Sequence, residues 1–359
     1  MASVRVLFVI STALRRGAEL QATLVAETLA ELGAITKVVA LESGAESGPH
    51  LEAELLGRRS LGLSTLLKLR RTASDFDVVV AFGSRSLPAC AVALSFGGTK
   101  WVYRNIGDPL AWQRGWLHRQ RTGALMRRAF GIVALWPGSA EAITRSYRVR
   151  PERIAVIPNN RSCLHFTPPT AAQRDAARAL LGVPSSLPIA AFIGSLSSEK
   201  NPELAIDAMA KLPEAHLLVA GDGPLRAACE ERGRASAPGR VHLLGAVADV
   251  RSVYHAADVV LLTSRTEGMP GVLIEAGMSG LPVVSTDVGA VLSIVVDGET
   301  GFVVEPSVDA VAAGITAALA LPAEKRELAR AVCIERFDRD SVADRWLRHL
   351  EAVCDAITH

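Results

Sequence analysis

The sequence predicts an α/β protein of two doubly wound, Rossmann-like domains, and three features of its 359 residues predict it. Short β-branched runs alternate with helical patterns along the chain, which is typical of βαβ units and parallel sheets. The alternation stops at a proline- and threonine-rich stretch, residues 166–170, and then starts again. A chain of this length also exceeds one ordinary domain and suits two domains that each bury a core.

The expected strands fall into two sets. In the first half they are residues 4–10, 35–41, 77–82, 100–103, 132–135 and 154–157, and in the second half 189–193, 216–220, 241–244, 259–263 and 282–286. The helix after the first strand is expected to bury one face formed by Leu20, Leu24, Val25, Leu29 and Leu32. A last helix is expected at residues 341–357. The predicted domains are therefore residues 1–165 and 166–340, joined at residues 166–170.

Charge is divided unequally between the two halves. Residues 1–165 contain 22 Lys and Arg against 12 Asp and Glu, whereas residues 166–359 contain 17 against 25. A basic half suggests that one domain meets an anionic surface or substrate. Compositional drift that left unequal solvated faces is the simpler alternative.

Composition excludes several other classes of protein. No stretch approaches the roughly 20 apolar residues of a membrane-spanning helix. The run 4–10 contains Arg5 and precedes no cleavage site, so we do not expect a signal peptide. The five cysteines are scattered and never paired as C-x-x-C, which fits a reducing cytoplasm and predicts neither disulfides nor a zinc site. Asp75 and Asp77 are spaced like a metal-binding D-x-D, but a turn-and-cap role is expected, so no metal is required.

The strongest chemical signal follows the strand expected at residues 259–263. The loop places Glu267 just before a helix that begins near Pro270, and Glu275 follows about one turn into that helix. Free amides at the helix start form an anion site suited to a diphosphate. Two carboxylates so close would repel a phosphate unless they bind something else, such as sugar or ribose hydroxyls. A helix start decorated with acidic residues because of its dipole is the alternative.

A second strand-to-helix loop supports the first. It runs Gly194-Ser-Leu-Ser-Ser-Glu-Lys200 after the strand 189–193, and Lys200 is a candidate counter-charge for the same diphosphate. The turn Gly221-Asp-Gly-Pro224 follows the next strand and is by itself only structural.

Five motifs in order resemble the retaining glycosyltransferases of family 4, which have the GT-B fold. They are Glu267-Gly-Met-Pro-Gly-Val-Leu-Ile-Glu275 with its continuation 280–289, the turn 221–224, the loop 194–201, Val-Ile-Pro-Asn at 156–159 and Gly17-Ala-Glu-Leu-Gln21. The resemblance covers nearly the whole chain and is strongest over residues 189–305. It implies two Rossmann-like domains that face each other across a cleft, with the helix at 341–359 packing back onto the first.

The resemblance also implies roles for single residues. Glu275 would hold the ribose hydroxyls, Glu267 the donor sugar, and Lys200 the departing diphosphate. The donor-binding set that it implies is Gly17, Gly194, Ser195, Lys200, Gly245, Ala246, Val247, Glu267, Gly268, Met269, Pro270, Gly271, Val272 and Glu275. Among these, 245–247 would lie against the nucleobase and Gly17 near the phosphates.

Three departures from the family pattern concern charge. Ser195 stands where the family often has arginine, so Lys200 has less help with the phosphates. Arg16 stands in the family's glycine pair and adds a cation. Many relatives carry a histidine after the fourth strand, whereas here that role is vacant or falls to Asn105 or Asp108, which with Arg16 are candidate acceptor-side residues.

The function that the resemblance implies is metal-free, retaining transfer of a hexosyl or N-acetylhexosaminyl group from a nucleotide sugar to a hydroxyl acceptor. A UDP-sugar is favoured over a GDP-sugar only by frequency within the family. A sugar-nucleotide epimerase is the main alternative, and a non-catalytic sensor would keep Glu275 without needing Lys200. A dehydrogenase is disfavoured because no G-x-G-x-x-G follows the first strand.

The acceptor is predicted from the basic half. Residues 112–121 and 126–128 interleave tryptophan with arginine on an expected helix, a composition typical of segments that meet anionic lipid headgroups. We therefore expect a cytoplasmic enzyme, peripheral at the inner membrane face, that acts on a lipid-linked phosphate acceptor in cell-envelope or polysaccharide biosynthesis. No nucleic-acid partner is expected. The alternative is a soluble small-molecule acceptor, with the same tryptophans packed in the core.

Overall fold

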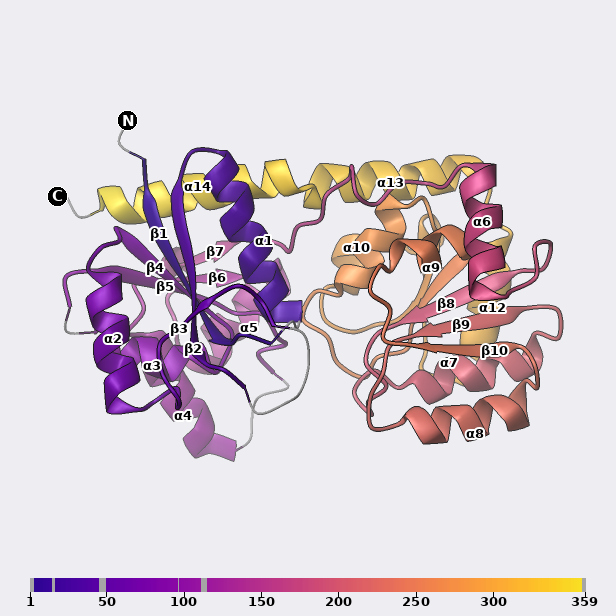
Figure 1. Ribbon diagram of the computed structural model, residues 1–359, viewed down its shortest axis with the longest axis horizontal. Coiled ribbons are helices and arrows are strands. Elements are labelled where there is room, and N and C mark those ends of the chain that lie inside the picture. The colour runs from indigo at the N-terminus through magenta and orange to yellow at the C-terminus, as the bar shows by residue number, and fades with distance from the viewer. Residues whose placement is uncertain (1–2, 15–16, 45–49, 96, 111–114, 357–359) are drawn as a thin grey trace. The chain divides into compact units, whose positions relative to one another are not determined.

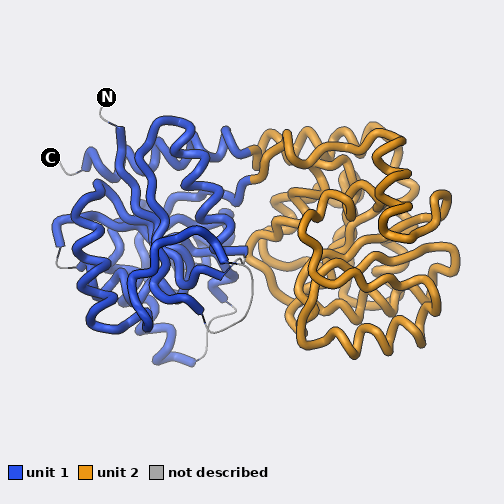
Figure 2. Tube along the Cα trace, viewed as in Figure 1, with its two compact units in different colours: residues 1–160, 339–359 blue, residues 161–338 orange. Residues whose placement is uncertain are grey.

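The computed structural model describes residues 3–14, 17–44, 50–95, 97–110 and 115–356. The chain forms two compact units (Figures 1 and 2). Unit 1 consists of residues 1–160 and 339–359, and unit 2 of residues 161–338. Each unit is an α/β layer structure built on one parallel sheet, as the sequence predicted.

Unit 1 contains a seven-stranded parallel sheet in the order β3-β2-β1-β4-β5-β6-β7. Its strands are β1 (Arg5–Thr12), β2 (Ile35–Glu42), β3 (Glu54–Leu55), β4 (Val78–Phe82), β5 (Lys100–Arg104), β6 (Gly131–Ala134) and β7 (Ile154–Val156). The chain starts at β1, builds outward to β3 and then returns to β4 on the other side. The strand order therefore reverses between β1 and β4, where ligands bind in doubly wound folds.

Helices cover both faces of this sheet (Figure 1). They are α1 (Gly17–Glu31), α2 (Leu63–Ala73), α3 (Ser86–Ala93), α4 (Gly115–Met126), α5 (Pro137–Tyr147) and α14 (Arg339–Asp355), with a 3-10 turn η1 (Pro151–Arg153) before β7. Successive residues of β1 feed opposite cores: Val6 and Phe8 pack with α1 and α14, whereas Leu7 and Val9 pack with the α2–α5 layer.

The last helix, α14, is part of the unit 1 core. Trp346 is fully buried, and its ring stacks on Phe82 with 6.2 Å between centroids. The guanidinium of Arg104, also fully buried, lies 5.4 Å from the Trp346 ring. The helix starts two residues earlier than expected, and its apolar stripe completes the face of the sheet that α1 leaves partly uncovered.

Unit 2 contains a six-stranded parallel sheet in the order β10-β9-β8-β11-β12-β13. Its strands are β8 (Ile189–Ile193), β9 (His216–Ala220), β10 (Val241–Gly245), β11 (Val259–Leu262), β12 (Val283–Thr286) and β13 (Gly301–Val304). Here the order reverses between β8 and β11, so the unit has its own switch point.

The helices of unit 2 again form two layers. Helices α7 (Pro202–Ala208), α8 (Arg226–Ser236) and α12 (Val308–Leu319) share a core with one face of the sheet, and η2 (Met209–Lys211) extends α7. The others are α6 (Ala171–Leu181), α9 (Arg251–Ala256), α10 (Gly271–Met278), α11 (Val291–Ile294) and α13 (Ala323–Phe337), among which α6 packs on α9 and α10 on α13.

The unit boundary differs from the expected linker. The chain passes between units at 160/161 and 338/339, rather than at 165/166 and 340/341. Residues 166–170 belong to unit 2, because Phe166 is buried with its ring edge-on to Tyr254 and Thr170 caps α6 in a capping box with Gln173. Proline and threonine here mark a helix start.

Most expected strands are present within one or two residues at each end, and β8 and β9 have the bounds that the sequence predicted. The two-residue β3 and the short β13 were missed. The expected face of α1 was partly wrong, since Leu20 and Leu32 are exposed while Ala22, Val25 and Leu29 are buried. Small residues bring α1 close to the sheet, and the leucines at its ends lie off that stripe.

Two further observations concern the chain as a whole. In the part of the chain that the structure describes, no helix is both long and apolar enough to cross a membrane. All five cysteines carry free thiols. Burial in apolar surroundings raises the pKa of Cys333 to about 12 and makes that thiol a poor nucleophile.

Candidate active site

The glycine-rich loops of unit 2 meet at the carboxyl edge of its sheet. Gly221 has φ +139°, its N–H donates to the carbonyl of Gly245 at 2.7 Å, and a Cβ here would collide with the carbonyl oxygen of Gly194. Only glycine permits this conformation and this approach. The structure therefore places side by side the loops that follow β8, β9 and β10. The loops after β8 and β10 were expected to contact the nucleotide, and the turn after β9 was expected to be only structural.

Lys200 and Glu267 form an ion pair beside the switch point. The Lys200 ammonium donates to Oε1 of Glu267 at 2.6 Å, and the hydroxyl of Ser264 donates to the same oxygen at 2.6 Å. Glu267 is only 8% exposed, so these donors hold its carboxylate in one position. The ammonium has three N–H donors and is partly exposed, which leaves it able to contact a ligand as well.

Glu275 is held from two sides. The hydroxyl of Tyr254, from α9, donates to Oε2 at 2.7 Å, and Nε of Arg161 donates to Oε1. Complete burial, reinforced by the Glu275 charge, raises the pKa of Tyr254 well above its ordinary value. The phenol therefore stays protonated and donates, which fixes the orientation of the carboxylate that the sequence assigned to ribose.

The helix that contains Glu275 starts without a side-chain cap. Pro270 was predicted to be the first residue of helix α10, but it is the N-cap residue, and the helix begins one residue later at Gly271. The Pro270 side chain makes no capping hydrogen bond. Gly268 precedes it and accepts the N–H of Ala290 at 2.9 Å, which fixes the loop that leads into the helix. The first amides of α10 thus have no capping side chain from Pro270 to satisfy them.

Two predicted donor-site segments follow the strands β10 and β8. Gly245 ends β10, an edge strand, with φ +72°, and the next residue, Ala246, is exposed. Ser195 follows β8, where its hydroxyl lies 3.2 Å from that of Ser197. A nucleobase contact at 245–247 stays a prediction.

In unit 1, Asn105 and Asp108 have structural partners. Asn105 is buried, and its amide donates to the carbonyl of Gly107 at 2.8 Å and to the hydroxyl of Ser139 at 3.3 Å. Asp108 accepts the N–H of Leu110 at 2.8 Å and so closes a turn. Gly17 is the exposed first residue of α1, and Arg16 lies outside the described residues.

A cavity of about 440 Å³ opens at the carboxyl ends of β4 and β5. Its polar lining includes Arg85, His118 and Arg121, together with Asn105 and the backbone of the following turn, and its walls include Leu87, Leu125 and Met126. No acidic side chain is among the described residues that line it. This cavity therefore combines apolar walls with positive charge.

Two family models match the chain. The model for glycosyl transferases group 1 matches residues 173–332, and that for the glycosyl transferase 4-like domain matches residues 16–160. The chain belongs to this glycosyltransferase family.

The similar proteins agree with that assignment. The D-inositol 3-phosphate glycosyltransferase of Corynebacterium diphtheriae is 31% identical over 234 residues, which cover 61% of this chain and 54% of the relative. The match thus spans about half the length of the curated relative. Among solved structures, Anabaena HepE in complex with UDP and glucose has a TM-score of 0.85 at 22% identity and covers 97% of this chain and 100% of its own.

A glycosyltransferase from Rickettsia africae has a TM-score of 0.83 at 20% identity, with 98% of this chain and 99% of that chain covered. At such identities these structures show the fold, and the α/β GT-B fold expected from the motifs is confirmed.

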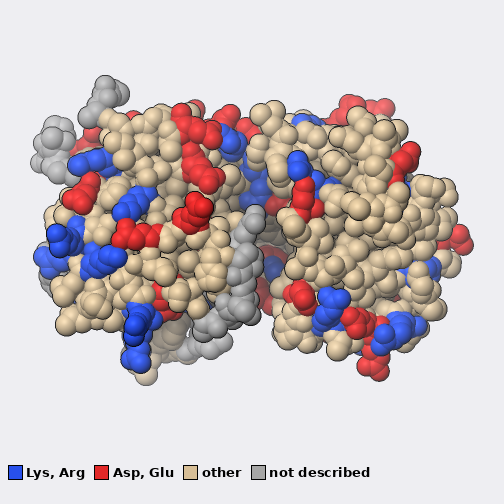
Figure 3. Space-filling model, viewed as in Figure 1, with Lys and Arg blue, Asp and Glu red and all other residues tan. Residues whose placement is uncertain are grey.

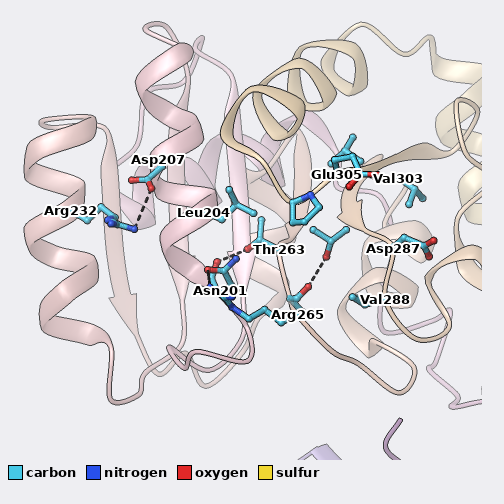
Figure 4. A pocket seen from close by; sticks show the side chains of 14 residues that line it. Asn201, Leu204, Asp207, Arg232, Thr263, Arg265, Asp287, Val288, Val303 and Glu305 are labelled. Carbon is cyan, nitrogen blue, oxygen red and sulfur yellow. Dashed lines mark hydrogen bonds and ion pairs between the residues drawn. The ribbon is translucent and has the colours of Figure 1, made fainter. Parts of the chain in front are cut away.

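A second cavity, in unit 2, is not lined by the predicted donor residues. It measures about 790 Å³ and lies at the carboxyl ends of β11, β12 and β13 and the start of α7 (Figure 4). Figure 4 shows Arg232 paired with Asp207, and two further carboxylates, Asp287 and Glu305, face the same space. The described lining has three carboxylates, on Asp207, Asp287 and Glu305, against two arginines, Arg232 and Arg265. This excess of negative charge disfavours a diphosphate, so the loops around Lys200 and Glu275 remain the better anion site.

Sequence reasoning missed three side chains that contact Glu267 or Glu275. Tyr254 fits the pattern of a core residue on a short helix, and nothing in the local pattern gives Ser264 a role. Arg161 lies two residues beyond the Val-Ile-Pro-Asn motif and 114 positions before its partner Glu275. No local pattern joins residues so far apart.

Asp77, the second aspartate of the D-x-D at residues 75–77, pairs with Arg5. Its carboxylate accepts the backbone N–H and the guanidinium of Arg5, each at an oxygen within 2.8 Å. That arginine lowers the pKa of Asp77. Asp77 thus joins β1 to the start of β4.

Proposed function

We propose that this protein transfers a sugar from a UDP-sugar to a hydroxyl acceptor with retention of configuration. The observation that carries the proposal is the cluster at the β8/β11 switch point, where Lys200–Glu267 and Glu275 lie beside the uncapped start of α10. Membership in the glycosyltransferase family supports it. Neighbouring structures solved with UDP and with UDP-glucose support uridine as the carrier.

In the proposed reaction each fixed group acts on one part of the donor. Glu275 accepts hydrogen bonds from the ribose hydroxyls, and Glu267 accepts them from the sugar. The amides at the start of α10 and Lys200 bind the diphosphate, where negative charge grows as the bond between the anomeric carbon and the phosphate oxygen breaks. Such preorganised donors stabilise the transition state more than the ground state.

The proton and the new bond balance without a protein nucleophile. The acceptor oxygen attacks the anomeric carbon from the face that UDP leaves, and its proton passes to the departing diphosphate oxygen. The products are the glycoside and UDP. This scheme uses no metal ion, so turnover should survive EDTA. Complete loss that magnesium or manganese restores would contradict it.

For the acceptor we propose a phosphate-bearing molecule that enters the 440 Å³ cavity of unit 1. Arg85, His118 and Arg121 would attract the phosphate, and the apolar wall would contact the rest. The relatives in Corynebacterium and Mycobacterium are named for inositol 3-phosphate, itself a phosphorylated acceptor. A lipid-linked phosphate and a free sugar phosphate share this chemistry, and transfer assays with each distinguish them.

The surface of unit 1 favours the lipid-linked source. Helices α2, α3 and α4 pack side by side (Figure 1), and their segment exposes large apolar side chains to solvent. Leu63 is 75%, Leu67 60%, Trp116 65% and Leu117 69% exposed. The alternative in which the tryptophans fill the core is therefore wrong for Trp116, whereas Trp112 lies outside the described residues.

Positive charge accompanies these apolar side chains. Residues 58–128 contain 13 Lys and Arg against 3 Asp and Glu. Lysines and arginines gather over α2 and toward α4 on the face shown in Figure 3. A basic surface with exposed leucine and tryptophan suits an anionic membrane. We propose that the protein acts at the inner membrane face, in cell-envelope or polysaccharide biosynthesis.

Thermal unfolding with a panel of nucleotides tests the donor. UDP and UDP-sugars should raise the midpoint, since a ligand that binds only the folded state stabilises it by mass action. Stabilisation by GDP alone would move the proposal to GDP-sugars, and no stabilisation by either would overturn it. Formation of an epimeric UDP-sugar in the absence of acceptor would favour the epimerase instead.

A further inference from the structure

Arg161 occupies the predicted donor site from outside the sequence motifs that define it. It is the first residue of unit 2, and its side chain reaches the start of α10. Its Nε donates to Glu275, while its Nη2 lies against Gly271, where a Cβ would collide with it. The guanidinium thus lies beside the helix start that was predicted to bind the diphosphate.

The three nearest atoms that a Cβ at Gly271 would meet all belong to Arg161. The φ of Gly271 is not in the left-handed region, so the backbone would accept alanine. The first turn of a helix would even favour alanine by about 1 kcal/mol. The absent side chain is therefore explained by the close approach of Arg161.

The backbone of Arg161 is also held. The backbone N–H of Arg161 donates to the carbonyl of Phe337 at 2.9 Å. Arg161 also forms an isolated parallel β-bridge with Asp338, where the chain leaves unit 2. The side chain is partly buried, at 22% exposed. Because both its backbone and its side chain are held, Arg161 needs little reorganisation when a ligand binds.

Charge balance in the cluster requires a second cation. Lys200, Glu267 and Glu275 together carry one net negative charge, which would repel a diphosphate, and Arg161 brings the four residues to neutrality. Ser195 stands where the resembled family often has arginine. A guanidinium also presents five N–H donors in a planar fork that matches phosphate oxygens.

We propose, on the basis of the proposed function, that Arg161 binds the diphosphate of the nucleotide sugar and replaces the cation missing at Ser195. It shares Glu275 with the ribose and directs its Nη groups toward the phosphate oxygens beside Gly271. Its role is binding, in contrast to the leaving-group role of Lys200. The alternative is that Arg161 only positions Glu275.

Calorimetry with UDP and with uridine separates these roles, because uridine has the ribose and no phosphate. Arg161→Met should weaken UDP binding by roughly 10- to 100-fold and leave uridine binding within about two-fold. Arg161→Lys, which keeps the charge, should recover part of the loss. Lys211→Ala is the matched control, since it removes one cation of unit 2 that pairs with Asp309.

Gly271→Ala provides a second variant that leaves Arg161 in the chain. It should displace the guanidinium and weaken UDP binding more than uridine binding. Equal weakening of UDP and uridine in both variants would show that Arg161 only positions Glu275, and unchanged UDP binding would remove it from the site. If the wild-type protein binds neither UDP nor GDP, the proposed function fails as well.

Discussion

The carboxyl edges of the two sheets are built alike and charged differently. In unit 2, the cations Lys200 and Arg161 are each paired with a buried carboxylate, Glu267 and Glu275. In unit 1, the cavity beside β4 and β5 is lined by Arg85, His118 and Arg121, and no acidic residue is among its described lining. Both regions lie where strands of a doubly wound sheet present their loops.

The difference shows how one architecture serves two kinds of recognition. Paired charges hold each other in position before a ligand arrives, which suits the diphosphate group that all nucleotide-diphosphate sugars share. Cations without acidic neighbours in their cavity attract an anion but fix it loosely. The first region therefore suits catalysis on the donor, and the second suits recruitment of an acceptor.

Lys200→Ala tests the paired charges of unit 2 and is expected to have the largest effect. Turnover should fall by roughly 10²–10³-fold, because the cation matters most as the diphosphate departs. Donor affinity should change less. Single-turnover kinetics alongside UDP calorimetry would measure both, with Lys211→Ala as control. If only the Michaelis constant rose, Lys200 would be a binding residue without a leaving-group role.

Glu275→Gln tests the carboxylate held by Arg161 and Tyr254. The amide loses a charge-assisted hydrogen bond of about 1.5–3 kcal/mol, so donor binding should weaken by roughly 10- to 150-fold. Tyr254→Phe, which removes only the hydroxyl that orients Oε2, should have a smaller effect. Nucleotide affinity that calorimetry finds unchanged in Glu275→Gln would remove the ribose assignment.

Arg121→Ala tests the proposed acceptor cavity of unit 1. The Michaelis constant for a phosphorylated acceptor should rise by roughly five-fold, as expected for an exposed charge contact, while UDP affinity stays constant. Arg145→Ala on α5, which removes an exposed arginine paired with Glu141, is the matched control. An equal loss for phosphorylated and unphosphorylated acceptors would exclude phosphate recognition in this cavity.

Flotation with vesicles tests the surface of α2 and α4. The protein should float with anionic lipid at low salt and be released at high salt, because a Debye length of about 3 Å at 1 M screens surface charge. Leu63→Ser and Trp116→Ser should each reduce flotation a few-fold. If the protein does not bind anionic vesicles even at low salt, the membrane proposal is wrong and a soluble acceptor is favoured.

Much of the architecture follows from local pattern. The alternation of β-branched runs with helical stretches predicted both parallel sheets, and β8 and β9 were located to the residue because each is a short run with four of its five residues buried. The segment that contains Glu267 and Glu275 was also found locally, because the two glutamates are only eight positions apart in one loop and the helix that follows it. A short edge strand such as β3 has too few residues to give such a pattern.

Sequence alone thus determined the fold class and the family, and it predicted a set of donor-site residues. Tertiary structure decided which of them meet: Arg161 and Tyr254 reach Glu275 across 114 and 21 positions, and α14 joins unit 1 after the whole of unit 2. Propensity and spacing act over a few residues, whereas ion pairs and core contacts depend on how distant segments pack. The charge of the predicted donor site is therefore a property of the folded chain.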